Sequence, residues 1–277
     1  MNKSHTKANP EKEMSFLEHL EELRWHLIRS TLAVLILAVL AFIFKDFIFD
    51  KIIFALRHGS FPTYKMFCSI SKAMDMDGFC FEELPFRIQS RTMSGQFSAH
   101  IWTSITTGIV LAFPYILFEM WKFISPGLKE KERKTSKGFI VTASLLFFAG
   151  VLFGYYLVAP LTIHFLGQYQ VSQEIFNDFD LESYISVVRT STLASGLIFE
   201  LPIIIYILTR IGLVTPEALR KYRKFALVGI LILSAIITPP DVVSQIIVSI
   251  PLLVLYEISI YISKIVVRKE KIEQAQV

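Results

Sequence analysis

The chain has 277 residues, of which 53% are hydrophobic and 19% are charged, and its formal net charge at pH 7 is +4. The mean hydropathy is +0.52, and the apolar residues fall in long blocks rather than in short amphipathic stripes. Because a helix needs about 20 apolar residues to cross a bilayer, these blocks exclude an ordinary soluble globule and predict an all-α polytopic membrane protein. The first 25 residues are polar and charged, unlike a cleavable signal peptide, so we expect the first apolar block to remain a membrane anchor.

Six membrane-spanning helices are expected, with the last two short. The first four lie at about 27–44, 101–118, 138–166 and 189–210, and Glu200 interrupts the fourth. The fifth, 225–238, has only 14 residues, and the sixth covers 242–262. Fourteen residues are few for about 30 Å of hydrocarbon. The last pair is therefore either two short crossings, which we favour, or a re-entrant hairpin that turns at 238–241.

Lysine and arginine predict the orientation of the chain. The N-terminal segment, the loops after the second and fourth spans, and the C-terminal tail together hold 19 of the 28 basic residues. The short opposite loops, 167–182 and 238–241, hold none; the long opposite segment, about 45–96, holds seven but counts for less because it is long. Both termini are therefore expected in the cytoplasm. We expect a disordered cytoplasmic tail over 1–13, a membrane domain over 14–264 and a second cytoplasmic tail over 265–277.

The long outer loop contains the only two cysteines, Cys68 and Cys80. An oxidising outer compartment permits a disulfide between them, and two free thiols are the alternative. No paired Cys/His spacing indicates a metal site.

Acidic residues stand out in two cytoplasmic segments. A capping-box pattern begins a short amphipathic helix at 15–24, in which three glutamates follow within five residues, Glu18, Glu21 and Glu22. The loop after the second span, 123–133, turns at Pro126 and Gly127 and carries Glu130 and Glu132. The alternative for both segments is an ordinary solvated surface.

Glu200 lies far from either end of its span, and a carboxylate at membrane depth indicates function by default. The alternative is a hydrogen-bonded contact between helices. Glu119 and Glu257 are weaker candidates of the same kind. Most spans contain proline, which kinks helices and favours a bent scaffold with a concave face.

No catalytic constellation is present in the sequence: there is no glycine-rich phosphate loop, nucleophile elbow or histidine–glutamate metal motif. We therefore expect neither an enzyme nor a cofactor, and no nucleic-acid partner. A proton-coupled small-molecule transporter using Glu200 and Glu257 is the alternative function. Such transporters often contain two related halves with paired broken helices, and no internal repeat is evident here.

Five motifs, in order from about Met14 to Lys264, resemble the TatC family of the twin-arginine protein translocase. They are His19–Arg24; Trp121–Leu128 with Glu132 and Arg133; Phe199–Pro202; Thr215–Lys221; and Thr238–Gln245. The resemblance implies a six-helix, glove-like, N-in/C-in fold in the cell inner membrane. It also implies a non-enzymatic receptor that binds Arg–Arg signal peptides of folded proteins. The implied partners are TatA- and TatB-type single-span proteins, and the proton motive force is implied to drive export.

The resemblance also assigns residues. Glu22 and Glu132 correspond to the family's recognition carboxylates, Arg24 belongs to the same signal-peptide-binding segment, and Glu200 corresponds to its intramembrane glutamate. The chemistry fits, because a guanidinium offers paired donors to a carboxylate whereas a lysine supplies only a point charge. A homo-oligomer within the translocase complex is implied as well.

The chain departs from the family pattern in three places. The outer loop has an apparent insertion around 65–83 that includes both cysteines, Arg189 stands where an apolar residue is common, and Glu119 stands where glutamine is frequent.

Overall fold

The structure, a computed structural model, describes residues 16–73, 80, 86–124, 136–175, 177–238 and 241–274. Five helical segments in it are long and apolar enough to cross a membrane: Leu20–Ile43, Gly95–Ile124, Gly138–Gln168, Leu181–Arg210 and Val242–Lys269. Each coincides with a span expected from the sequence. The chain is therefore an all-α, multi-pass membrane protein.

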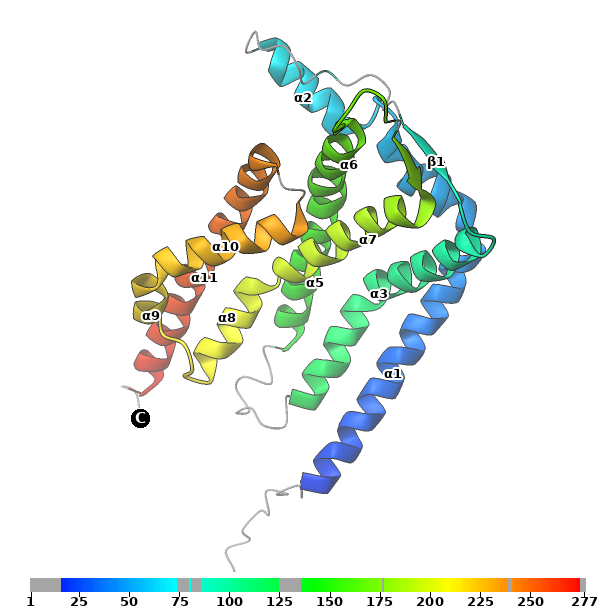
Figure 1. The fold of residues 1–277 in the computed structure, drawn as a ribbon. Coiled ribbons are helices and arrows are strands. Elements are labelled where there is room, and N and C mark those ends of the chain that lie inside the picture. Colours follow the sequence, from blue (N-terminus) through cyan, green and yellow to red (C-terminus); the bar gives the residue numbers. More distant parts are fainter. Residues whose placement is uncertain are drawn as a thin grey trace, which may run out of the picture.

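These segments are built from a longer series of helical elements (Figure 1). They are α1 (Phe16–Ile43), α3 (Gly95–Ile124), α5 (Ser136–Phe153) with the π-helical η4 (Gly154–Val158) and α6 (Ala159–Gln168), α7 (Leu181–Ile198), α8 (Leu201–Arg210) and α11 (Val242–Gln274). Pro114 and Pro251 lie inside α3 and α11 without ending them. Helix α11 continues to Gln274, so the tail expected from 265 onward begins as the last turns of this helix.

The fifth expected span forms α10 (Arg223–Ile237), which follows the short α9 (Pro216–Lys221). With 15 residues, α10 is about 22 Å long, which is less than the hydrocarbon thickness of about 30 Å. A crossing of the membrane by α10, and with it a total of six crossings, therefore remains a prediction.

The segment between the first two long helices folds into a cap at one end of the molecule. It contains η1 (Phe47–Ile53), η2 (Phe54–Arg57), α2 (Pro62–Ala73) and β1 (Arg87–Gln89). Strand β1 pairs in parallel with β2 (Asp178–Asp180), so the fold includes one small sheet that helical periodicity did not predict. A disulfide joins Cys68 of α2 to Cys80.

Tyrosine hydroxyls tie the cap to the long helices. Tyr64 donates hydrogen bonds to the carbonyl groups of Leu56 and Pro160, and Tyr184 donates one to the carbonyl of Ile53. Their rings belong to a buried apolar cluster that also includes Leu56 and Ile163. Burial raises the pKa of Tyr64 well above its usual value, so this hydroxyl remains a donor.

Two glycines allow neighbouring helices to touch backbone to backbone. A Cβ on Gly108 of α3 would lie 2.7 Å from the carbonyl oxygen of Val34 on α1. A Cβ on Gly150 of α5 would lie 2.5 Å from the carbonyl oxygen of Ser195 on α7. Small residues at such contacts are the usual means by which membrane helices pack closely.

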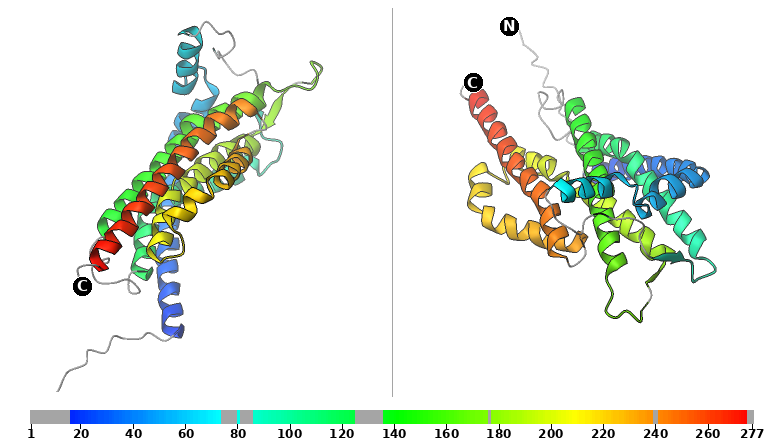
Figure 2. Two further views of the ribbon diagram at one scale, coloured as in Figure 1. Left: turned by 90° about the vertical axis from the view of Figure 1, so that its left-hand side faces the viewer. Right: turned by 90° about the horizontal axis from the view of Figure 1, so that it is seen from above.

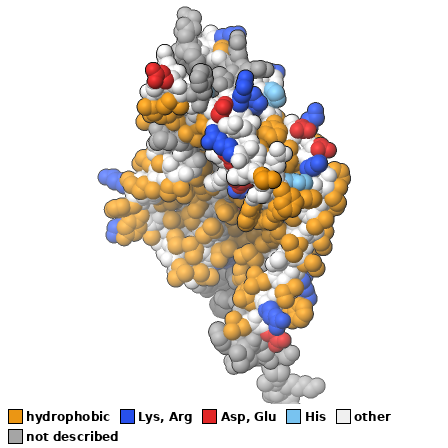
Figure 3. Space-filling model, turned by 45° about the vertical axis from the view of Figure 1, so that its right-hand side comes forward, with side chains coloured by type: hydrophobic (Ala, Val, Ile, Leu, Met, Phe, Trp, Pro, Cys, Tyr) orange, Lys and Arg blue, Asp and Glu red, His pale blue; other side chains and the backbone are white. Residues whose placement is uncertain are grey.

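The N-terminal end of α1 and the C-terminal end of α11 lie at the same end of the molecule, and the cap lies at the opposite end (Figures 1 and 2). Between these ends, hydrophobic side chains cover the middle of the face drawn in Figure 3, with charged side chains above and below. On α1 alone, large apolar side chains such as Leu32, Leu35, Ile36 and Val39 remain exposed. Lipid is the medium that such a surface requires.

Candidate functional site

The candidate site lies where α1 begins and α3 ends. Glu22 and Arg24 lie in the first turns of α1; the Glu22 side chain is partly buried and Arg24 is exposed. Glu132, the second expected recognition carboxylate, lies outside the described residues. Helix α3 ends at Ile124, eight residues before Glu132. The described structure therefore locates only one half of the expected carboxylate pair.

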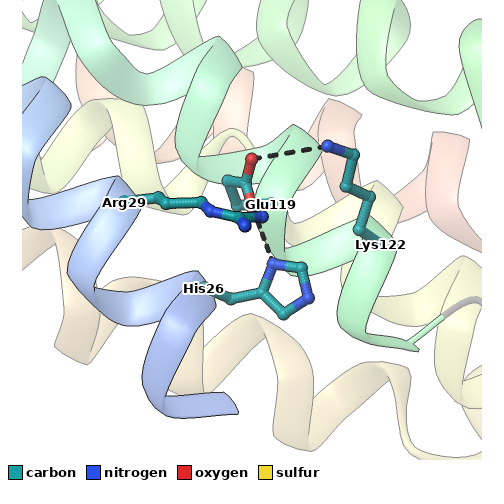
Figure 4. A network of polar contacts seen from close by, with 4 residues as sticks. All are labelled: His26, Arg29, Glu119 and Lys122. Atoms are coloured by element: carbon teal, nitrogen blue, oxygen red, sulfur yellow. Dashed lines mark hydrogen bonds and ion pairs between the residues drawn. The ribbon is translucent and has the colours of Figure 1, made fainter. Parts of the chain in front are cut away.

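A group of polar side chains joins α1 to α3 just above this end (Figure 4). We call His26, Arg29, Glu119 and Lys122 the Glu119 cluster. Glu119 is the centre: its carboxylate lies 2.6 Å from Nδ1 of His26, 3.6 Å from Nζ of Lys122 and 3.9 Å from a guanidinium nitrogen of Arg29. Its side chain is only 2% exposed, so it requires these partners to offset the loss of water.

The contact between α1 and α3 at the Glu119 cluster determines the height of Glu22 relative to α3. Glu22 precedes His26 by four residues, so both project from the face of α1 that packs on α3. Four residues are about 6 Å along a helix, and the five residues from Glu119 to Ile124 are about 7.5 Å. Glu22 is thus level with the last turn of α3. The edge-on contact between the rings of His26 and Phe123, with centroids 6.2 Å apart, agrees with this placement.

Sequence reasoning underestimated Glu119. It treated this residue as a weak candidate near a helix end, whereas the structure makes it one of the most buried charged side chains in the described ranges. Its main partner is 93 positions away in the sequence, so no local pattern reveals the contact. The available signal was Lys122, three residues later on the same helical face.

Glu200 lies at a break between α7 and α8. Helix α7 ends at Ile198, α8 begins at Leu201, and Pro202 occupies the first turn of α8. The Glu200 side chain is buried, with the residue 7% exposed, and within the described residues its Oε1 accepts no hydrogen bond. The hydrogen-bonded contact between helices that we considered as the alternative is therefore not found for this atom.

Two other ion pairs provide partners for Arg189 and Glu257, to which the sequence assigned none. Arg189 lies 3.3 Å from Glu182, two turns earlier on α7, and so pairs with this residue rather than with Glu200. Arg223 at the start of α10 lies 2.6 Å from Glu257 on α11, and both side chains are about half exposed, at 51% and 54%. Glu257 is therefore neither buried nor unpaired, which weakens the transporter alternative.

A metal centre finds no support in the described ranges, where no group of three or more His, Cys, Asp or Glu side chains is suitably placed to hold an ion.

Comparison with known proteins agrees with the arrangement of helices. The sequence model of the family described as "Sec-independent protein translocase protein (TatC)" matches residues 18–251. The TatC protein of Blattabacterium sp. subsp. Periplaneta americana is 44% identical over 264 residues, covering 95% of this chain and 99% of its own length. The TatCy protein of Bacillus subtilis and the TatC protein of Aquifex aeolicus are each 34% identical and cover 93% of this chain; the alignments span 91% and 98% of their own lengths.

Two solved structures are also similar. A crystal structure of the twin-arginine translocase receptor TatC has a TM-score of 0.64 and 32% sequence identity, covering 90% of this chain and 100% of that one. A second, of the same receptor in DDM, has a TM-score of 0.67 and 33% identity, covering 89% and 99%. By its sequence along most of its length and by its helical fold, the chain belongs to the TatC family, whose members are membrane components of the Sec-independent protein translocase and not enzymes.

Proposed function

We propose that the chain is the receptor subunit of a twin-arginine translocase and binds the paired arginines of signal peptides at its cytoplasmic face. The solved relatives carry the name of twin-arginine translocase receptor. The observation that carries the proposal here is the placement of Glu22. It projects from α1 level with the end of α3, from which the loop bearing Glu132 departs.

The lack of a partner for Glu22 among the described residues supports the same role. Within the described residues, neither Glu21 nor Glu22 enters a hydrogen bond or an ion pair, so the Glu22 carboxylate is available to a ligand. An arginine fork matches a carboxylate with two parallel hydrogen bonds, which lysine cannot reproduce. One arginine would bind Glu22 and the other Glu132, with Arg24 at the edge of the same segment.

The remaining parts of the proposal concern the assembly. The chain lies in the cell inner membrane with six crossings and both termini in the cytoplasm, over the membrane domain 14–264. It works with TatA- and TatB-type single-span proteins and further copies of itself, and the proton motive force drives the export of folded cargo. The common position of the ends of α1 and α11 supports an even number of crossings (Figure 1).

The test is cross-linking of a photoreactive Arg–Arg signal peptide to the full-length chain in membranes. Glu22→Ala and Glu132→Ala should each reduce the cross-linked product about tenfold, because a hydrogen-bonded charge contributes about 1.5–3 kcal/mol. Glu21→Ala is the matched control, since it removes the same charge from the adjacent position, outside the face shared with His26. A Lys–Lys peptide should cross-link weakly to every form. Undiminished cross-linking in both the Glu22 and the Glu132 variants would refute the proposal.

A further inference from the structure

A pocket of about 630 Å³ opens at the capped end of the molecule, opposite Glu22. It lies among the end of α1, the η1–η2 segment, β1, and the starts of α3 and α7. We call it the outer-rim pocket. Its volume falls in the range of about 300–1,000 Å³ that is usual for sites that bind small molecules.

The ends of three membrane-length helices place this pocket at the membrane surface. Lys45 follows the segment Leu20–Ile43 by two residues, Gln96 and Phe97 are in the first turn of Gly95–Ile124, and Leu181 begins Leu181–Arg210. All of them line the pocket. Because three apolar helices end at its walls, the pocket opens at the level where acyl chains give way to headgroups.

Three basic side chains of the outer-rim pocket form no ion pair or side-chain hydrogen bond with the described residues. Lys45, Arg57 and His58 line it, all three are exposed, and in the part of the chain that the structure describes none of them forms an ion pair or a side-chain hydrogen bond. Asp46 is the only carboxylate among the lining residues, so the wall carries a net positive charge even with its histidines neutral. Figure 3 brings this side of the molecule forward, with basic, acidic and histidine side chains above the hydrophobic surface.

Aromatic rings form another part of the wall, and two of them are held by ring contacts. Phe49 contacts the edge of His100, with ring centroids 5.8 Å apart, and His100 in turn hydrogen-bonds the carbonyl of Phe42. Phe54 stacks on Tyr184 at 6.1 Å. Phe97 projects at the rim, with 62% of its surface exposed. A soluble anion would use only the cations of such a wall, whereas an amphiphile would use both the cations and the rings.

We propose that the outer-rim pocket binds the headgroup of an anionic phospholipid. Lys45 and Arg57 would contact the phosphodiester, because an ammonium and a guanidinium are the side chains that bind phosphate most strongly. The aromatic residues would lie along the glycerol and the first carbons of the acyl chains. Basic pockets between membrane helices bind acidic lipid headgroups on the matrix or cytoplasmic side of membranes, and the same charge complementarity is available here at the opposite surface. In the proposed orientation the lipid belongs to the outer leaflet, and the proposal does not rest on the signal-peptide site.

Native mass spectrometry of the full-length chain, released from detergent with added lipid, tests this proposal. Phosphatidylglycerol should remain bound at least about fivefold more than phosphatidylcholine. Lys45→Gln combined with Arg57→Gln should abolish this preference. Lys51→Gln combined with Lys65→Gln is the matched control; it removes the same charge from exposed positions of the same cap that do not line the pocket, and it should retain the preference. Lys45→Arg with Arg57→Lys should retain it as well.

Size-exclusion chromatography verifies that each variant is folded; should the Gln pair aggregate, Lys45→Gln and Arg57→Gln are measured singly and should each weaken retention about twofold or more. Inorganic phosphate at millimolar concentration should leave the bound lipid in place. The proposal is overturned if the Gln variants retain phosphatidylglycerol as the wild type does, if the control pair loses it equally, or if free phosphate displaces it.

Discussion

Nδ1 of His26 lies 2.6 Å from Oε2 of Glu119, and this contact joins α1 to α3 across 93 positions of the sequence. The contact lies one helical turn above Glu22 and near the end of α3. It therefore couples the stability of this helix pair to the geometry of the proposed recognition site.

Replacing Glu119 with Ala should destabilise the protein. The change leaves His26 without its partner and opens a cavity at a position that is 1% exposed, so the free energy of unfolding should fall by about 1–3 kcal/mol. Thermal unfolding in detergent would measure this loss as a lower Tm. Glu119→Gln keeps an acceptor for His26 and should have a smaller effect. Glu174→Ala, on an exposed loop, is the control; an equal Tm in the Glu174 and Glu119 alanine variants would contradict the expected role.

Replacing Glu200 should separate two stages of signal-peptide binding. Because this carboxylate is buried at the break between α7 and α8, Glu200→Ala should leave the cytoplasmic docking of the peptide intact. It should weaken the insertion of the apolar part of the peptide, or assembly with partner subunits. Cross-links from the Arg–Arg region and from the apolar region of one peptide would report the two stages separately. A parallel loss of both would show that Glu200 acts on the whole fold.

Replacing Gly150 should disturb the contact between α5 and α7. The added Cβ of Gly150→Ala would lie 2.5 Å from the carbonyl oxygen of Ser195, so the helices would have to separate, at a cost of about 1–3 kcal/mol. Gly138→Ala, on the same helix, meets no atom within 4 Å and should change the stability by less than about 0.5 kcal/mol. Thermal unfolding of both variants would decide; equal shifts in Tm would argue against close backbone packing.

Asp241 should stabilise α11 in a pH-dependent way. Its carboxylate accepts hydrogen bonds from the backbone N–H groups of Ser244, at 2.8 Å, and Val243, at 3.3 Å, and so caps the helix. Burial raises the pKa of Asp241, but the hydrogen bonds from Ser244 and Val243 outweigh it and hold the pKa below its usual value of 3.8. The charged form is therefore favoured in the folded state, and its contribution is present above pH 3.8 and lost as the pH falls through the folded pKa.

Asp241→Ala should accordingly cost about 1 kcal/mol at pH 7. Asp241→Asn keeps an acceptor without the charge, and its difference in Tm from the wild type should shrink as the pH is lowered from 7 to 3. A difference that stays constant over this range would show that the charge has no part in the cap.

The sequence was sufficient to predict the long helices, because runs of apolar residues report membrane crossings directly. All five membrane-length segments lie over expected spans, and the break at Glu200 falls where a charge interrupts the apolar run. The cap was not predicted. Its η1, η2 and β1 elements depend on contacts with α6, α7 and β2, more than 70 residues further on, so no local periodicity indicates them.

The candidate site was predicted only in part. Glu200 was singled out by its charge inside an apolar run, and Glu22 by the resemblance to the TatC family; the roles of both remain predictions. Glu119 was undervalued because its partners His26 and Arg29 come from another helix. The proposed pairing of Glu22 with Glu132 remains a prediction. The ion pair between Arg223 and Glu257 was also missed, since 34 positions separate the two residues.

Helix α1 contacts α3 closely at two heights along the pair. Gly108 brings the two backbones into contact near the middle, and the Glu119 cluster joins them near the end that carries Glu22. Because the two helices are in contact at two heights, we expect α1 and α3 to tilt together as one rigid unit. A displacement of Glu22 would then also move the far end of α3, where Gln96 and Phe97 line the outer-rim pocket.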